Sequence, residues 1–69
     1  MQVYSPEEVL KRVKFITKDH YDNDLAKRLG ISKQSLSQYK NKVSIDVQLR
    51  IISLLIAEIE EITSKSGKD

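Results

Sequence analysis

The sequence of 69 residues contains no cysteine and no tryptophan, one proline, two glycines and one histidine. The absence of cysteine excludes disulfide bonds and thiolate metal sites, and the single imidazole of His20 cannot form a zinc site by itself. A composition of 39% hydrophobic and 32% charged residues with so little proline and glycine is typical of a soluble helical domain. A chain of this length forms one domain with a small core, so we expect self-association to add stability.

Features of enzymes and membrane proteins are also scarce. No residues form a recognisable nucleophile and base, so we expect no enzyme. Nothing in the sequence suggests a cofactor or a metal site, and without a second domain we expect no small-molecule ligand. The longest apolar run, residues 54–57, is much shorter than a membrane span. The first six residues lack the basic and then apolar order of a signal peptide. We therefore expect a cytoplasmic protein that makes no membrane contact.

The net charge of +2 is distributed unevenly. Residues 25–45 contain five basic residues and no acidic residue, whereas the segments on either side have a small negative net charge. A basic segment between two mildly acidic ones is expected where the middle of a chain meets a polyanion. On charge alone, the better interpretation of these basic residues is an ordinary solvated surface. The motif that the same segment contains is the stronger indication of function.

Capping residues predict two helices in the first part of the chain. Ser5 followed by Pro6 places a capping hydroxyl before a proline at the first helical position, which predicts a helix over residues 6–17. Asp22 is a good capping residue for a second helix over residues 23–29. No segment has the alternating pattern of a strand.

Two further helices follow. Ser32 is expected to cap a third helix over residues 33–40, and a fourth helix is expected to begin at residue 44 or 45 and end near residue 63. The sequence therefore predicts an all-α fold, with a compact four-helix domain over residues 1–63 and a flexible C-terminal tail over residues 64–69.

Residues 22–39 have the pattern of a helix-turn-helix. Ala26 is small where the second helix of the pair would cross close above the first, and Gly30 allows the backbone conformation that the tight turn requires. These two positions define which sides of the two helices face inward. The residues expected to face the core are Leu25, Leu29, Ile31, Leu36 and Tyr39.

The outward face of the predicted third helix contains amides, hydroxyls and an ammonium group but no acidic group. Glutamine can pair with adenine through two hydrogen bonds, lysine can reach the acceptors of guanine, and serine can bind either base. Basic residues beside such a face are placed for phosphate contacts. The predicted DNA-binding residues are Lys33, Gln34, Ser35, Ser37 and Gln38 on this helix, Lys40, Asn41 and Lys42 at its end, and Lys27 and Arg28 on the preceding helix.

This segment resembles the lambda repressor/Cro-like helix-turn-helix family of the xenobiotic-response-element type, and in particular its small phage forms. The resemblance covers about residues 9–56 and implies a helical DNA-binding domain that dimerises on palindromic operators and represses transcription. It also implies that Lys33, Gln34 and Gln38 read bases. The sequence has Lys42 where family members usually have glycine. The resemblance depends on Ala26, Gly30, Ile31, Ser32 and Leu36.

The predicted fourth helix contains more apolar residues than a small domain can cover on one side. We expect one broad stripe to face the core, and a second apolar set on another face to form a homodimer contact together with Phe15. In the alternative, the N-terminal segment folds back over the second set. The expected core stripe is Ile45, Leu49, Ile52, Leu55, Ile56, Ile59 and Ile62, and the expected dimer residues are Val47, Ile51, Leu54 and Phe15.

Together these features predict a phage-type transcriptional regulator that binds double-stranded DNA as a homodimer on a palindromic operator. The alternative is a protein-interaction module, such as an antitoxin or a phage regulator, in which the apolar last helix binds a partner chain and the helical hairpin is only a scaffold. DNA binding by the chain alone distinguishes the two.

Overall fold

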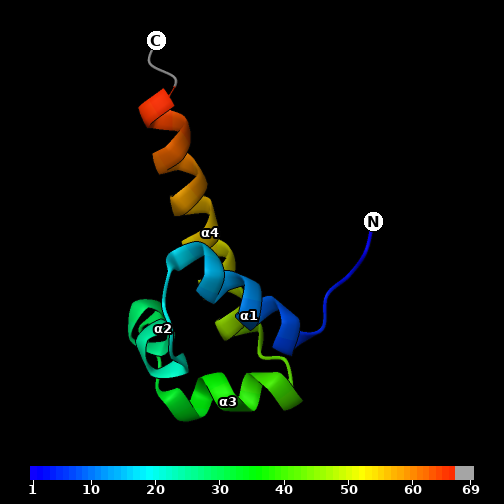
Figure 1. The fold of residues 1–69 in the computed structure, drawn as a ribbon. Helices are drawn as coiled ribbons and strands as arrows, with labels where there is room; N and C mark the ends of the chain where they lie inside the picture. Colours follow the sequence, from blue (N-terminus) through cyan, green and yellow to red (C-terminus); the bar gives the residue numbers. More distant parts are fainter. Residues whose placement is uncertain (67–69) are drawn as a thin grey trace.

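The structure is a computed structural model that describes residues 1–66, and these residues form four α-helices and no strand. Helices α1, α2 and α3 gather around the first part of α4, and the rest of α4 extends away from them (Figure 1). The predicted all-α four-helix fold is confirmed. The helices are α1 (Pro6–Thr17), α2 (Asp22–Leu29), α3 (Lys33–Asn41) and α4 (Ile45–Ser66).

The end of α4 lies beyond the expected position. The helix continues to Ser66 instead of ending near residue 63, so the first three residues of the predicted tail are helical. Residues 67–69 of that tail lie outside the described residues. None of the helices within residues 1–66 is long and apolar enough to cross a membrane.

Local interactions explain where α1 begins and ends. The hydroxyl of Ser5 accepts a hydrogen bond from the backbone N–H of Glu8 at 3.2 Å, and Pro6 occupies the first helical position. The helix ends at Lys18, whose φ of 64° lies in the left-handed region. Glycine is the residue that adopts this conformation without a steric penalty, so a lysine here is a local strain.

The turn between α2 and α3 depends on a glycine and on α4. Gly30 has a φ of 75°, and the N–H of Ile31 donates to the carbonyl of Ala26 at 3.0 Å. Arg50 of α4 donates from Nη1 to the carbonyl of Leu29 at 3.0 Å. A Cβ atom at Gly30 would lie only 3.2 Å from the same Nη1. The turn is therefore closed by glycine and is held from the side by the last helix.

The core is formed by residues from all four helices. Tyr39 is buried, and its hydroxyl is hydrogen-bonded to the side-chain oxygen of Gln48 on α4. Burial raises the pKa of the Tyr39 hydroxyl, which therefore stays a neutral donor. The buried residues are Leu10, Val13, Leu25, Ala26, Leu29, Leu36, Tyr39, Val47 and Ile51.

The orientation of α4 differs from the prediction, and of the expected core stripe only Leu55 is partly buried against the core. Val47 and Ile51 are 4% and 3% exposed, so the prediction that these two residues bind a second copy is wrong, and Leu54 is partly buried against the core. Val47 and Ile51 belong to the core cluster that includes residues of the other three helices, and α4 packs against α2 and α3. Phe15 is exposed, as a contact residue would need to be. The residues expected in the core but exposed are Ile45, Leu49, Ile52, Ile56, Ile59 and Ile62.

Both faces of α4 are apolar, and the helical period alone does not show which one the domain covers. The deciding contacts come from α2 and α3, to which the helix is packed through its positions 47, 51 and 54. These positions are spaced by four and three residues and therefore lie on one side of the helix. The opposite side is left uncovered within the described part of the chain.

Candidate nucleic-acid interface

Helix α3 lies at the end of the molecule opposite to the C-terminal end of α4 (Figure 1). Its inner side is fixed by Leu36 and Tyr39, which are fully or almost fully buried. Its other side faces solvent and contains no acidic residue. The predicted contact residues exposed on α3 and directly after it are Lys33, Gln34, Ser37, Gln38, Asn41 and Lys42.

The first turn of α3 is capped as predicted. The Oγ of Ser32 accepts a hydrogen bond from the N–H of Ser35 at 3.0 Å, and the Ser32 hydroxyl donates to the Oγ of Ser35 at 3.0 Å. Ser35 is half-buried, so its side chain supports the cap. Its own hydroxyl proton remains able to donate to a neighbouring acceptor.

At its other end α3 is not closed by a left-handed residue. Lys42 has a φ of −141°, which is extended backbone that any residue adopts, and its N–H donates to the carbonyl of Gln38 at 2.8 Å. A glycine is therefore not required at this position. The lysine fits the turn, and its side chain remains exposed beside α3.

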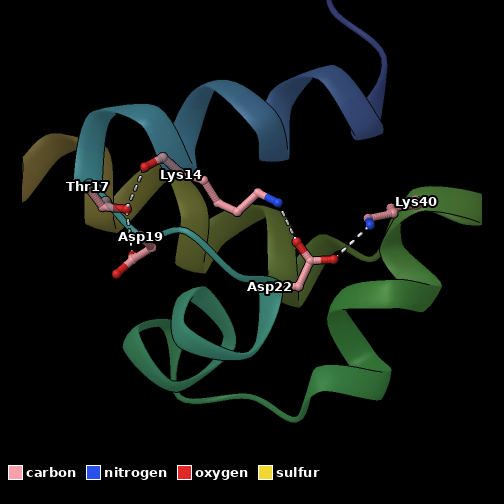
Figure 2. A network of polar contacts seen from close by, with 5 residues as sticks. All are labelled: Lys14, Thr17, Asp19, Asp22 and Lys40. Carbon is pink, nitrogen blue, oxygen red and sulfur yellow. Dashed lines mark hydrogen bonds and ion pairs between the residues drawn. The ribbon is translucent and has the colours of Figure 1, made fainter.

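A single carboxylate joins three helices behind this surface. Asp22 accepts from Lys14 of α1 at 2.6 Å and from Lys40 of α3 at 2.8 Å (Figure 2). These hydrogen bonds, first from Lys14 and then from Lys40, hold the pKa of Asp22 below its usual value. The prediction that Asp22 caps α2 is wrong, because Tyr21 occupies the capping position without a side-chain bond and Asp22 is the first helical residue.

A second carboxylate binds one of the predicted phosphate contacts. Asp19 accepts from Nε and Nη2 of Arg28 at 2.8 and 3.1 Å and from the hydroxyl of Thr17 at 2.6 Å; the contact with Thr17 is visible in Figure 2. Arg28 and then Thr17 hold the pKa of Asp19 below its usual value. Two parallel hydrogen bonds give this pair a defined geometry.

The basic residues predicted to contact DNA therefore differ in whether their charged groups are free to bind a phosphate. Lys40 and Arg28 already have acidic partners, and each would have to exchange that partner for a phosphate. Lys27, Lys33 and Lys42 are exposed and form no ion pair within residues 1–66. In the described part of the chain, these three lysines thus supply the free ammonium groups beside α3.

The chain matches the family of bacteriophage CI repressor helix-turn-helix domains over residues 8–68. It belongs to this family. The match spans most of the chain, and it confirms the resemblance to lambda repressor/Cro-like helix-turn-helix proteins. No curated protein and no solved structure matches the chain significantly. Membership in the CI repressor family identifies the chain as a DNA-binding regulator.

The residues that hold α3 in this CI repressor domain were missed by sequence reasoning. Asp22 was interpreted as a cap, and the bond from Arg50 to the carbonyl of Leu29 joins positions 21 apart in the chain. Arg50 also lies four residues after Asp46, to which it is paired at 3.1 Å, and this local spacing is the more obvious interpretation. Long-range pairs of this kind have no signal in a single sequence.

Proposed function

We propose that the chain binds a palindromic operator as a homodimer in the cytoplasm and represses transcription, with α3 in the major groove of the DNA. One observation carries this proposal, namely the outward face of α3. That face is exposed, rich in amides and hydroxyls, free of acids, and held rigidly from behind by the core and by the ion pairs of Asp22. These are the properties that direct reading of base edges requires.

Gln34 and Gln38 are the strongest base readers on this face. They lie four positions apart on one helix, so their amides stand one above the other and can reach neighbouring base pairs in one groove. Lys33 comes in the first turn of the helix, where free backbone N–H groups also favour a phosphate. Lys27 and Lys42 flank the face and supply phosphate contacts that fix its position on the duplex.

Repression needs no catalytic group. Two copies on an operator present two α3 helices about one turn of DNA apart, which is roughly 34 Å. A dimer bound across a promoter excludes polymerase by occupying the site. This mechanism requires no cofactor, metal or small-molecule ligand.

The test is selection of genomic fragments by the purified chain at near-physiological salt, followed by sequencing, footprinting and gel shifts. We expect the bound fragments to share an inverted repeat with half-sites about 10 base pairs apart. Enrichment of a single asymmetric site would contradict binding as a symmetric dimer. Failure to enrich any sequence would contradict specific recognition, and binding that requires an added partner protein would favour the protein-interaction module.

A further inference from the structure

A line of exposed apolar side chains runs along α4. The residues follow one another at intervals of four, three, four and three positions, which is the seven-residue repeat of a helix that packs along a second helix. No charged residue interrupts the line. Its members, with the exposed fraction of each, are Ile45 (77%), Leu49 (57%), Ile52 (43%), Ile56 (48%) and Ile59 (61%). We call these five residues the α4 stripe.

The α4 stripe is directed away from the rest of the molecule. Val47, Ile51 and Leu54 occupy the opposite side of α4 and pack in or against the core. The stripe also continues onto the part of α4 that extends beyond α1, α2 and α3 (Figure 1). A contiguous exposed apolar surface of this kind marks a site of interaction, because its exposure to water is unfavourable.

We propose that the α4 stripe packs against the same stripe of a second copy, with the two α4 helices parallel. This inference rests on the proposed function and specifies how the two copies are joined. The stripe is self-complementary, since an uncharged apolar line fits an identical line along its whole length. In the heptad pattern, Leu49 and Ile56 occupy position a, and Ile45, Ile52 and Ile59 occupy position d.

The charges beside the stripe favour the parallel direction. Asp46 and Glu60 lie along one flank of the stripe, and the other flank has the uncharged Gln48 and Leu55. In a parallel pair, the acidic flank of each helix faces the uncharged flank of its partner. In an antiparallel pair, Asp46 would lie near Glu60 of the partner subunit, and this repulsion would occur twice.

The position of α3 favours the same direction. Helix α3 lies at the end of the molecule from which the C-terminal end of α4 points away (Figure 1). Parallel α4 helices place both α3 helices at one end of the dimer, so both can reach the same duplex. Antiparallel α4 helices would place the two α3 helices at opposite ends of the dimer and facing in opposite directions. The 22 residues of α4 give this helix a length of about 33 Å.

The inference is tested by placing a charge on the stripe. Ile52→Lys and Ile56→Lys should each raise the dissociation constant of the dimer by at least about a hundredfold, because each puts two ammonium groups into an apolar seam. Ala57→Lys is the matched control, since Ala57 is exposed on α4 and lies outside the stripe. The mass is measured by sedimentation equilibrium, and circular dichroism verifies that each variant is folded.

We expect a mass of two chains for the unmodified protein and for Ala57→Lys, and a mass of one chain for both stripe variants at the same concentration. A mass of one, three or four chains for the unmodified protein would overturn the inference, as would a dimer that survives both stripe substitutions. A gel shift separates this result from the proposed function. If the folded Ile56→Lys variant is monomeric and binds a single half-site, the result supports both the pairing through α4 and the proposed function. If the unmodified protein has a mass of two chains but binds no DNA, the result contradicts only the proposed function.

The direction is tested by disulfide formation, since the chain has no cysteine of its own. In a parallel pair each residue of the stripe lies beside its own copy, so Leu49→Cys alone and Ile59→Cys alone should each form a disulfide-linked dimer on mild oxidation. In an antiparallel pair Leu49 would lie near Ile59 of the partner subunit. Cross-linking only in a mixture of the two variants would therefore overturn the parallel arrangement.

Discussion

Asp22 and Lys40 stand 18 positions apart in the chain, and their side chains form a 2.8 Å ion pair between the start of α2 and the end of α3. The second carboxylate oxygen of Asp22 binds Lys14 of α1, so one side chain joins three helices (Figure 2). The buried side chains of α3 are Leu36 and Tyr39. The ion pair therefore supplies a polar attachment close to the C-terminal end of α3, where Asn41 and Lys42 follow.

We expect Asp22→Asn to lower the free energy of unfolding by about 1–2 kcal/mol at pH 7, because two charge-assisted hydrogen bonds are weakened. The lysines lower the pKa of Asp22 below its ordinary value of 3.8. Its contribution is therefore complete above pH 3.8 and is lost as the pH falls through the lower pKa of the folded state. Urea unfolding at neutral and acidic pH should show a difference between wild type and variant that shrinks in acid.

The matched control for this prediction is Asp24→Asn, which neutralises an exposed carboxylate on the same helix. We expect it to change the free energy of unfolding much less than Asp22→Asn. Equal effects of the two substitutions, or a difference that stays constant down to the most acidic pH at which the protein is folded, would contradict the role assigned to Asp22.

We expect Gln34→Ala to weaken binding to the selected operator by about 1–3 kcal/mol, and binding to random DNA much less, because the role proposed for the lost amide is to read a base. Fluorescence anisotropy with both duplexes at one salt concentration measures the ratio. Gln2→Ala removes the same group from the exposed N-terminal segment and should leave both affinities unchanged. An equal loss on both duplexes for Gln34→Ala would argue against base reading.

Lys42→Ala should weaken binding to the operator and to random DNA by similar factors, because the role proposed for its ammonium group is a phosphate contact. The slope of log affinity against log salt should become shallower by about 1. Lys18→Ala removes the same charge at the end of α1, outside the predicted DNA-binding residues, and should leave the slope unchanged. If the slope of log affinity against log salt for Lys42→Ala equals that of the wild type, the phosphate contact is excluded.

Lys18→Gly should stabilise the fold by about 0.5–1 kcal/mol, because Lys18 ends α1 with a φ of 64° and glycine adopts this conformation without the penalty of a Cβ atom. Thermal unfolding of the variant should show a higher midpoint than that of the wild type. The paired substitution Gly30→Ala should act in the opposite direction, since Gly30 has a φ of 75° and little space beside Arg50. A lower unfolding midpoint for Lys18→Gly would mean that the lysine side chain stabilises the fold by more than the strain at its backbone destabilises it.

The starts of α1 and α3 could be predicted because their signals are local. Ser5 with Pro6, and Ser32, act on residues within one turn of themselves, so the cap geometry follows from the order of a few side chains. Gly30 likewise needs only its own backbone freedom to close the turn. For the same reason, the outward face of α3 followed from the burial of Leu36 and Tyr39.

The orientation of α4 and the pairing of Asp22 could not be predicted in this way. Both sides of α4 are apolar, with Val47 on one side and Leu49 on the other, and only the shape of the other three helices decides which side is buried. Asp22 has the chemistry of a helix cap, and its actual partners come from α1 and from the far end of α3. Both features depend on which distant residues meet after folding.

The bond from Arg50 to the carbonyl of Leu29 attaches the last helix directly to the turn before α3. A tilt of α4 would therefore pull on this turn through the Arg50 side chain. Adding or removing one base pair between half-sites rotates one of them by about 34–36° around the DNA axis. If two copies pair through α4 as proposed, this link opposes such a rotation, and we expect the affinity to depend strongly on the centre-to-centre spacing of the half-sites.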